Sequence, residues 1–250
     1  MKIDLAGKKA LVGGSSKGIG LGIASQLAES GASVCLMARN KSKLEEIINQ
    51  LPNSENHSYL IVDFSNFEEY KIKIEAYLEN NQVDILVNNT QGPSAGNSLS
   101  KDIDSYQEAF DLLFKSIVYT TSLIVPKMQK NKWGRIINVT SVSVKEPLNY
   151  LVLSNSIRSA VVAWAKSLSV DVGKDGVTVN SILTGYFDTE RIKELNKEKS
   201  KSLNISEEEV LEKMKSLVPT NRLGKTEEYG YLVSFLSSDK ASYINGASIP

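Results

Sequence analysis

A glycine-rich turn near the start of the chain carries the residue types that bind phosphate groups. It follows the apolar run 10–12 and opens a segment whose apolar residues recur at helical spacing. Free backbone N–H groups and the positive end of a helix attract anions there, and glycines let a pyrophosphate approach closely. At the first strand–helix junction of a 250-residue chain, the pattern predicts a dinucleotide site rather than a tight turn without a ligand. The turn residues expected to contact the dinucleotide are Gly14, Ser16, Lys17, Gly18, Ile19 and Gly20.

A basic residue, Arg39, stands directly after the predicted second strand, where the adenosine ribose lies in a doubly wound fold. A carboxylate at this point would bond both ribose hydroxyls and repel a 2′-phosphate. Arg39 and Lys17 offer two cations instead, and a guanidinium matches phosphate oxygens bidentately. The pair favours NADP(H) as the cofactor; the alternative is that Arg39 is a surface cation at a strand end.

The elements that must position these residues alternate between strand and helix along the chain. Strands are predicted at 9–13, 33–38, 59–62, 83–87, 134–139, 177–183 and 243–249. Helices are predicted at 18–29, 41–50, 67–79, 105–130 (one or two), within 149–173 and at 226–238, with a charged helical stretch over 187–220. This alternation predicts an α/β fold: one Rossmann-type domain over 1–250, with a doubly wound parallel sheet of about seven strands and helices on both faces.

Composition narrows the class of protein. Lys+Arg and Asp+Glu balance at 29 each, so nothing in the net charge points to nucleic acid or an anionic membrane. The single cysteine, Cys35, cannot form an internal disulfide, and the only histidine, His57, makes a zinc site improbable. The start of the chain lacks the apolar core of a signal peptide, and no run of about 18 apolar residues is present. We therefore expect a cytoplasmic protein without a metal, a membrane span or a nucleic-acid partner.

The order Gly14-x-x-x-Gly18-x-Gly20 resembles the short-chain dehydrogenase/reductase family, with Gly13 where a threonine usually stands. Segments 88–92, 134–141 and 184–189 also resemble that family, and the β-ketoacyl-acyl carrier protein reductases in particular. The resemblance implies hydride transfer with a nicotinamide cofactor and a mobile substrate lid at 187–220, the region in which members differ most. Further cofactor contacts that it implies are Asp63, Phe64, Asn89, Thr90, Arg158, Gly185 and Thr189.

The catalytic centre departs from the family pattern. Ser141 matches the family's serine, but Ser154 stands at the tyrosine position, Arg158 at the lysine and Leu113 at the asparagine. A tyrosine beside an ammonium is an acid suited to carbonyl reduction, whereas a serine hydroxyl ionises far less readily. Arg158 keeps a positive charge that can hold ribose hydroxyls but cannot give up a proton. The residues expected to bind the cofactor are therefore retained, and the usual proton donor is lost.

Three tyrosines could replace that donor, or could be ordinary packed side chains. Tyr150 precedes Ser154 by one helical turn, Tyr186 follows Gly185, and Tyr119 lies on a long helix where a core position is favoured.

The leading prediction is NADP(H)-dependent hydride transfer to or from a carbonyl or hydroxyl group of a small molecule or acyl thioester. The alternatives are reduction of an activated C=C bond, as in 2,4-dienoyl-CoA reductases, which also carry serine at the tyrosine position, and a catalytically silent cofactor-binding or scaffold protein. Apolar long helices, together with the habit of the family, predict a homodimer or homotetramer.

Overall fold

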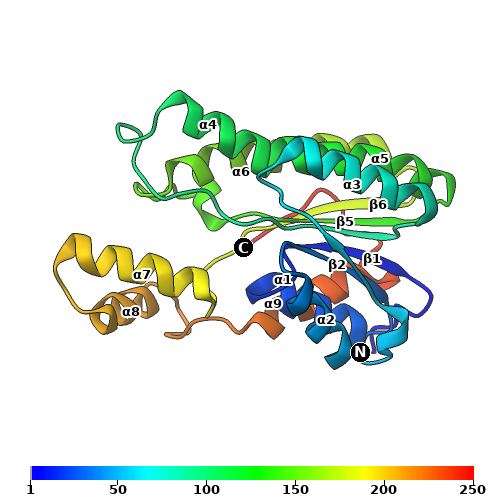
Figure 1. The fold of residues 1–250 in the computed structure, drawn as a ribbon, viewed down its shortest axis with the longest axis horizontal. Coiled ribbons are helices and arrows are strands. Elements are labelled where there is room, and N and C mark those ends of the chain that lie inside the picture. Colours follow the sequence, from blue (N-terminus) through cyan, green and yellow to red (C-terminus); the bar gives the residue numbers. More distant parts are fainter. Residues whose placement is uncertain (1) are drawn as a thin grey trace.

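A computed structural model describes residues 2–250, whose seven strands form one parallel sheet (Figure 1). The strand order across the sheet is β3-β2-β1-β4-β5-β6-β7, so the direction of winding reverses between β1 and β4. This arrangement confirms the doubly wound α/β fold expected from the sequence. The strands are β1 (Lys9–Gly13), β2 (Ser33–Ala38), β3 (Ser58–Ile61), β4 (Ile85–Asn88), β5 (Gly134–Val139), β6 (Val177–Ile182) and β7 (Ser248–Ile249).

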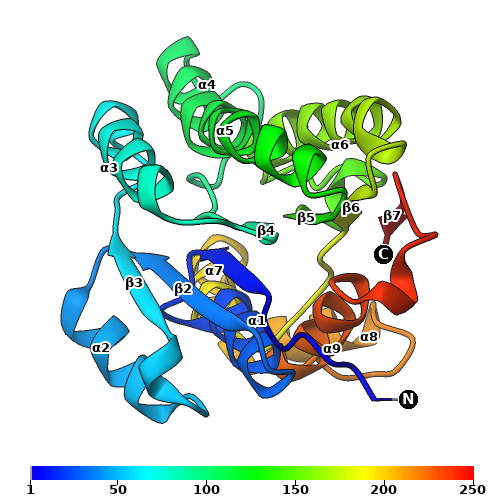
Figure 2. The same ribbon diagram turned by 90° about the vertical axis from the view of Figure 1, so that its right-hand side faces the viewer.

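Helices cover both faces of the sheet (Figure 2). One layer consists of α1 (Gly18–Glu29), α2 (Lys41–Gln50) and α9 (Thr226–Leu236). The other layer consists of α3 (Phe67–Asn80), α4 (Ile103–Phe110), α5 (Ser116–Lys130) and α6 (Val152–Gly173). A separate pair, α7 (Glu190–Leu203) and α8 (Glu207–Ser216), projects beyond the sheet in the part of the chain expected to form the lid (Figure 1).

The central strands are apolar because both of their faces are covered. Every residue of β4, β5 and β6 is buried. Apolar side chains of the two helical layers pack against opposite faces, with Ile23 and Val233 in one cluster and Ile74 and Ile124 in the other. Strands of this composition are typical of parallel sheets, and they leave the loops at their carboxyl ends free to carry a site.

The long helix predicted over 105–130 begins at Ile103, where the side chain of Asp102 accepts a hydrogen bond from the Ser105 N–H at 2.9 Å. A π-helical turn at Asp111–Lys115 divides it into α4 and α5. By length and composition Ile103–Lys130 could cross a membrane, and 44% of its most apolar window is buried inside the fold. The helix lies along the sheet in the layer with α3 and α6 (Figure 2).

The prediction of a strand over 243–249 was wrong for most of its length, since only Ser248–Ile249 pairs with β6. A short 3₁₀ turn occupies Asp239–Ala241, and Gly246 has a φ of 70°, in the left-handed region that turns the chain. Side chains at full exposure, such as Tyr243, show that this segment is not a buried strand.

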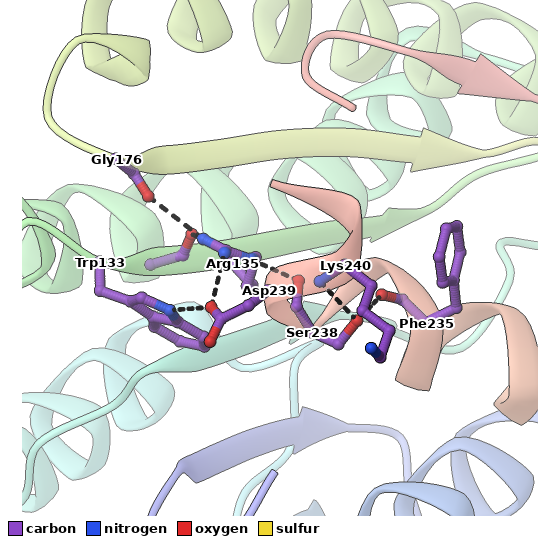
Figure 3. Close-up of polar contacts among 8 residues, drawn as sticks. Trp133, Arg135, Gly176, Phe235, Ser238, Asp239 and Lys240 are labelled. Carbon is purple, nitrogen blue, oxygen red and sulfur yellow. Dashed lines mark hydrogen bonds and ion pairs between the residues drawn. The ribbon is translucent and has the colours of Figure 1, made fainter. Parts of the chain in front are cut away.

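A buried arginine joins the amino-terminal ends of β5 and β6 (Figure 3). The side chain of Arg135 is 2% exposed and donates hydrogen bonds to the carbonyls of Gly134 (2.8 Å) and Gly176 (3.1 Å). Its Nη2 lies 3.4 Å from Oδ1 of Asp239, which also accepts from Nε1 of Trp133 at 2.7 Å. This cluster lies at the strand ends opposite those that carry the dinucleotide turn, so its role is to hold the sheet together.

Candidate active site

A cleft of about 740 Å³ opens at the carboxyl ends of the central strands, beside the reversal of strand order between β1 and β4. Ligands of doubly wound folds bind at this place. The cleft brings together the predicted site residues Gly14, Ser16, Lys17, Gly18, Ile19, Gly20, Arg39, Phe64, Asn89, Thr90, Ser141, Tyr150, Ser154, Arg158, Gly185, Tyr186 and Thr189. Asp63 is the one expected cofactor contact that does not line it.

The glycine turn has a backbone that only small residues tolerate. Gly18 has a φ of 58°, and a Cβ on Gly20 would lie 2.2 Å from the carbonyl oxygen of Gly14. No side chain of the described residues caps the amino end of α1, so its first N–H groups remain free for an anion. The side chain of Asn89 donates to the Gly13 carbonyl at 2.9 Å and holds the turn against the end of β4. These features fit the pyrophosphate of a dinucleotide.

Sequence reasoning did not single out Ser15, whose side chain holds this turn in place through hydrogen bonds to the backbone. Its buried hydroxyl donates to the Val12 carbonyl and accepts from the Met37 N–H, each at 3.0 Å. The preceding strand and its neighbour β2 are thereby tied to the turn. A small hydroxyl residue inside a glycine-rich turn is the only sequence signal that could have suggested this role.

Basic side chains surround the end of the cleft expected to hold the adenosine ribose. Arg39 is largely exposed, and its Nη1 lies 3.9 Å from Oδ2 of Asp63. Asp63 in turn accepts hydrogen bonds from the N–H and hydroxyl of Ser65 at 2.9 and 2.6 Å. Although partial burial works against it, these bonds and the charge of Arg39 lower the pKa of Asp63, so this carboxylate is ionised. Lys43, which the sequence did not single out, also lines this end.

Lys17 makes an ion pair that the sequence did not predict. Its Nζ lies 2.5 Å from Oε2 of Glu190, the first residue of α7. Both side chains are more than 60% exposed, so the pair adds little to the stability of the fold. It does join the glycine turn to α7, and it partly neutralises one of the two cations expected to meet a 2′-phosphate.

The reacting end of the cleft is built by β5 and α6. Ser141 follows β5, and its hydroxyl accepts a hydrogen bond from the Ser143 N–H at 3.1 Å. Ser154 and Arg158 lie one turn apart on α6 and both face the cleft. Nη1 of Arg158 donates to the Val139 carbonyl at 2.6 Å. Burial lowers the pKa of Arg158 to about 10, which leaves the guanidinium charged at neutral pH.

Tyr150 and Tyr186 are half-buried and line the same end of the cleft. Tyr150 lies in the turn before α6, which begins at Val152, so it is not a helical residue one turn before Ser154, although both side chains line the cleft. Burial raises the pKa of both phenols, and Tyr186 raises that of Tyr150 further. Both therefore keep their protons at neutral pH.

Two further residues named from the sequence, one tyrosine and the residue at the family's asparagine position, lie away from the cleft. Tyr119 is on α5, and its hydroxyl donates to Glu75 of α3, outside the cleft. Leu113 is fully buried within the π-helical turn, in the apolar cluster beneath α5. The position at which family members carry asparagine therefore presents only an apolar side chain here.

Two further features of the site were not predicted from the sequence. Arg191 of α7 lines the cleft, and its Nη2 donates to the Pro93 carbonyl at 2.9 Å. Behind the cleft wall, the hydroxyls of Thr184 and the buried Tyr229 are hydrogen-bonded at 3.0 Å. Nothing in the spacing of these residues could reveal that α7 and α9 come this close to the strand ends.

Known proteins that resemble this chain match it over nearly its whole length. A family profile described as "Enoyl-(Acyl carrier protein) reductase" matches residues 14–250. The chain is 31% identical to the 3-oxoacyl-[acyl-carrier-protein] reductase FabG of Pseudomonas aeruginosa, with 99% of this chain and 97% of that one covered.

Solved structures with the same fold include L-sorbose reductase of Gluconobacter frateurii in complex with NADPH and L-sorbose. Its TM-score is 0.91 and its sequence identity is 29%, and the match covers 100% of this chain and 96% of that one. A 3-oxoacyl (acyl-carrier-protein) reductase of Agrobacterium tumefaciens with NADP bound has a TM-score of 0.89 and 26% identity over 99% and 94%.

Proposed function

The chain belongs to the short-chain dehydrogenase/reductase family, and we propose that it transfers hydride between NADP(H) and a carbonyl or hydroxyl substrate, as a 3-oxoacyl reductase does. One observation carries this proposal: a single cleft contains the glycine turn, the basic side chains of the adenosine end, and Ser141 with Arg158 at the other end. The two ends are joined by one continuous wall, so a dinucleotide bound at the turn can reach the polar residues of β5 and α6.

The cofactor in this proposal is NADP(H). The glycine turn would hold the pyrophosphate, Arg39 and Lys17 the 2′-phosphate, and Arg158 the hydroxyls of the nicotinamide ribose. NADPH or NADP accompanies two of the solved relatives, which agrees with the basic adenosine end. When bound, the cofactor supplies or accepts the hydride.

Ser141 is the residue that orients the substrate. Its hydroxyl accepts a hydrogen bond from the Ser143 N–H, which leaves its own proton to donate toward the cleft. A carbonyl oxygen gains negative charge as hydride reaches its carbon, and a fixed O–H donor stabilises that charge. The hydroxyl of Ser154, one turn before Arg158, is placed to act as a second donor.

The proton that completes carbonyl reduction needs another source. Ser154 is a poor acid, and Arg158 stays charged at neutral pH, so Tyr150 and Tyr186 are the remaining donors among the described residues at the reacting end of the cleft. Since burial raises the pKa of each, a rate that depends on either phenol should fall only above pH ~10.

A second candidate function is reduction of a C=C bond conjugated to a carbonyl. Hydride addition to the β carbon gives an enolate, whose oxygen Ser141 and the fixed positive charge of Arg158 could stabilise without an acid at that oxygen. The absence of a tyrosine with a lowered pKa among the described cleft residues favours this reading. The proton would then reach carbon from water.

Three variants separate the two functions. Ser154→Tyr combined with Arg158→Lys restores the family's acid, so a carbonyl reductase that merely lost it should gain ketone reduction. If Tyr150 or Tyr186 already donates the proton, the double variant gains little, and Tyr150→Phe or Tyr186→Phe in the parent lowers the rate. A C=C reductase should keep its enoyl activity in both phenylalanine variants.

The first experiment is a screen of NADPH oxidation with ketones, β-ketoacyl thioesters and enoyl thioesters. Turnover of the first two classes supports carbonyl reduction, and turnover of the third alone supports C=C reduction. NADPH binding without oxidation by any of these substrate classes would replace the enzyme proposal with a catalytically silent cofactor-binding or scaffold protein.

We further propose that the protein is cytoplasmic and assembles as a homodimer or homotetramer.

A further inference from the structure

Apolar and aromatic side chains line the cleft that also contains Ser141. They come from the turn before α6, from α7 and α8, and from the segment after β6: Leu148, Leu151, Ile192, Leu195 and Met214, with Tyr150 and Tyr186. Met214 is buried and the others are half-buried. Such a surface fits a substrate whose body is an aliphatic chain or ring rather than a polyol.

Arg191 lines the same cleft, and most of its hydrogen-bonding capacity is unused. Among the described residues only the Pro93 carbonyl accepts from it, so four of its five N–H donors have no partner. The nearest carboxylate, Glu194 three residues along α7, lies 3.7 Å away, and both side chains are 40% exposed or more. A helix-surface pair of this kind contributes little, so it leaves the guanidinium free to bind a stronger partner.

A second guanidinium, that of Arg158, lines the same cleft. It is half-buried and donates to one described acceptor, the Val139 carbonyl. After burial, the charge of Arg191 is a further cause that lowers the pKa of Arg158. Two positive charges in a partly desolvated space repel each other. An anion bound beside them would offset the free energy of that repulsion.

We propose that Arg191 anchors a carboxylate of the substrate itself, so that the cleft selects an apolar acid over its neutral analogues. The fork of N–H groups on a guanidinium matches the two oxygens of a carboxylate. Arg191 would hold the acid group at the lid, the apolar walls would take the body, and the reacting carbon would face Ser141. The position of the reacting group rests on the proposed function, whereas the preference for an acid does not.

Another role for Arg191 is a purely structural one, in which its bond to Pro93 fastens the lid. Arg191→Gln tests the difference, because a glutamine amide can still donate to a carbonyl but carries no charge. Arg222→Gln is a matched control: Arg222 lies beyond the lid, outside the cleft, and is paired bidentately with Glu228 at 2.6 and 2.8 Å.

Hexanoate and hexanamide are suitable probes, because they share one apolar body and differ in charge. Isothermal titration calorimetry of the whole chain, with and without saturating NADP⁺, measures the dissociation constant of each probe. We expect hexanoate to bind about tenfold or more tightly than hexanamide, in line with a charge-assisted hydrogen bond. Arg191→Gln should abolish this preference, and Arg222→Gln should keep it.

Equal affinity for the two probes, no hexanoate binding at millimolar concentration, or a preference that survives in Arg191→Gln would each overturn the proposal. The titrations involve no turnover, so a failure of hydride transfer does not affect them. Failure of the cofactor site would appear separately, as an absence of heat when NADP⁺ itself is added.

Discussion

Replacement of Arg39 by aspartate should reverse the cofactor preference of this protein. Arg39 is the cation at the carboxyl end of β2, and its side chain is 64% exposed. A carboxylate at this place would repel a 2′-phosphate and could accept hydrogen bonds from the ribose hydroxyls of NADH. NADPH should therefore bind more weakly to Arg39→Asp, and NADH should bind as well as before or more tightly.

The size of the effect follows from the surroundings of Arg39. A hydrogen bond to a charged group contributes about 1.5–3 kcal/mol. Exposure to solvent and the carboxylate of Asp63 at 3.9 Å both weaken the attraction to a phosphate. We therefore expect a loss near the lower limit, about 1.5 kcal/mol, which is roughly tenfold in the dissociation constant of NADPH.

Isothermal titration calorimetry with NADPH and NADH measures this change directly. Lys41→Asp is the matched control, since Lys41 is an exposed cation on α2 that does not line the cleft and lies 3.7 Å from Glu45. Glu190→Gln should act in the opposite direction to Arg39→Asp, because it releases Lys17 for the phosphate. Equal affinities for the two cofactors in the parent, or equal losses in Arg39→Asp and Lys41→Asp, would refute the reasoning.

Three further predictions concern catalysis, stability and assembly. Arg158→Ala should weaken NADPH binding, whereas Ser141→Ala should leave that affinity unchanged and lower kcat. Calorimetry measures the affinity and steady-state kinetics measures kcat, and identical behaviour of the two variants would contradict the assigned roles. Arg135→Met should lower the free energy of unfolding in urea by about 1–3 kcal/mol, because the buried Gly134 carbonyl loses its donor, against less than about 1 kcal/mol for Arg222→Met; similar losses would argue against a structural role for the cluster in Figure 3. Light scattering at micromolar concentration should give at least twice the mass of one chain, and a monomer would exclude the proposed pairing of the long helices.

Periodicity located the regular elements well where the strands are continuous and apolar. The bounds predicted for β1, β2 and β5 agree with the structure, because their residues pack against helices on both faces. The last strand was overestimated, since the turn at Gly246 separates an exposed segment from the two residues that pair with β6.

Local spacing also found most of the cleft wall but could not reveal contacts between distant segments. Glycines and strand-end residues mark the cofactor half because each follows its own strand directly. The partners of Lys17 and Arg191 lie 173 and 98 residues away in the sequence, so only the folded chain places α7 against the glycine turn and the Pro93 loop. The residues of α7 that we expect to select the substrate belong to this second group.

Transfer of deuterium from NADPH labelled at C4 of the nicotinamide tests the central claim most directly. The protein is incubated with labelled NADPH and any substrate that promotes NADPH oxidation, and the product is analysed by mass spectrometry. If the cleft performs hydride transfer, the product gains one deuterium from one of the two C4 epimers, and Ser141→Ala slows its appearance. Oxidation of NADPH without deuterium in the product, or binding of NADPH with no oxidation by any substrate class, would contradict the account.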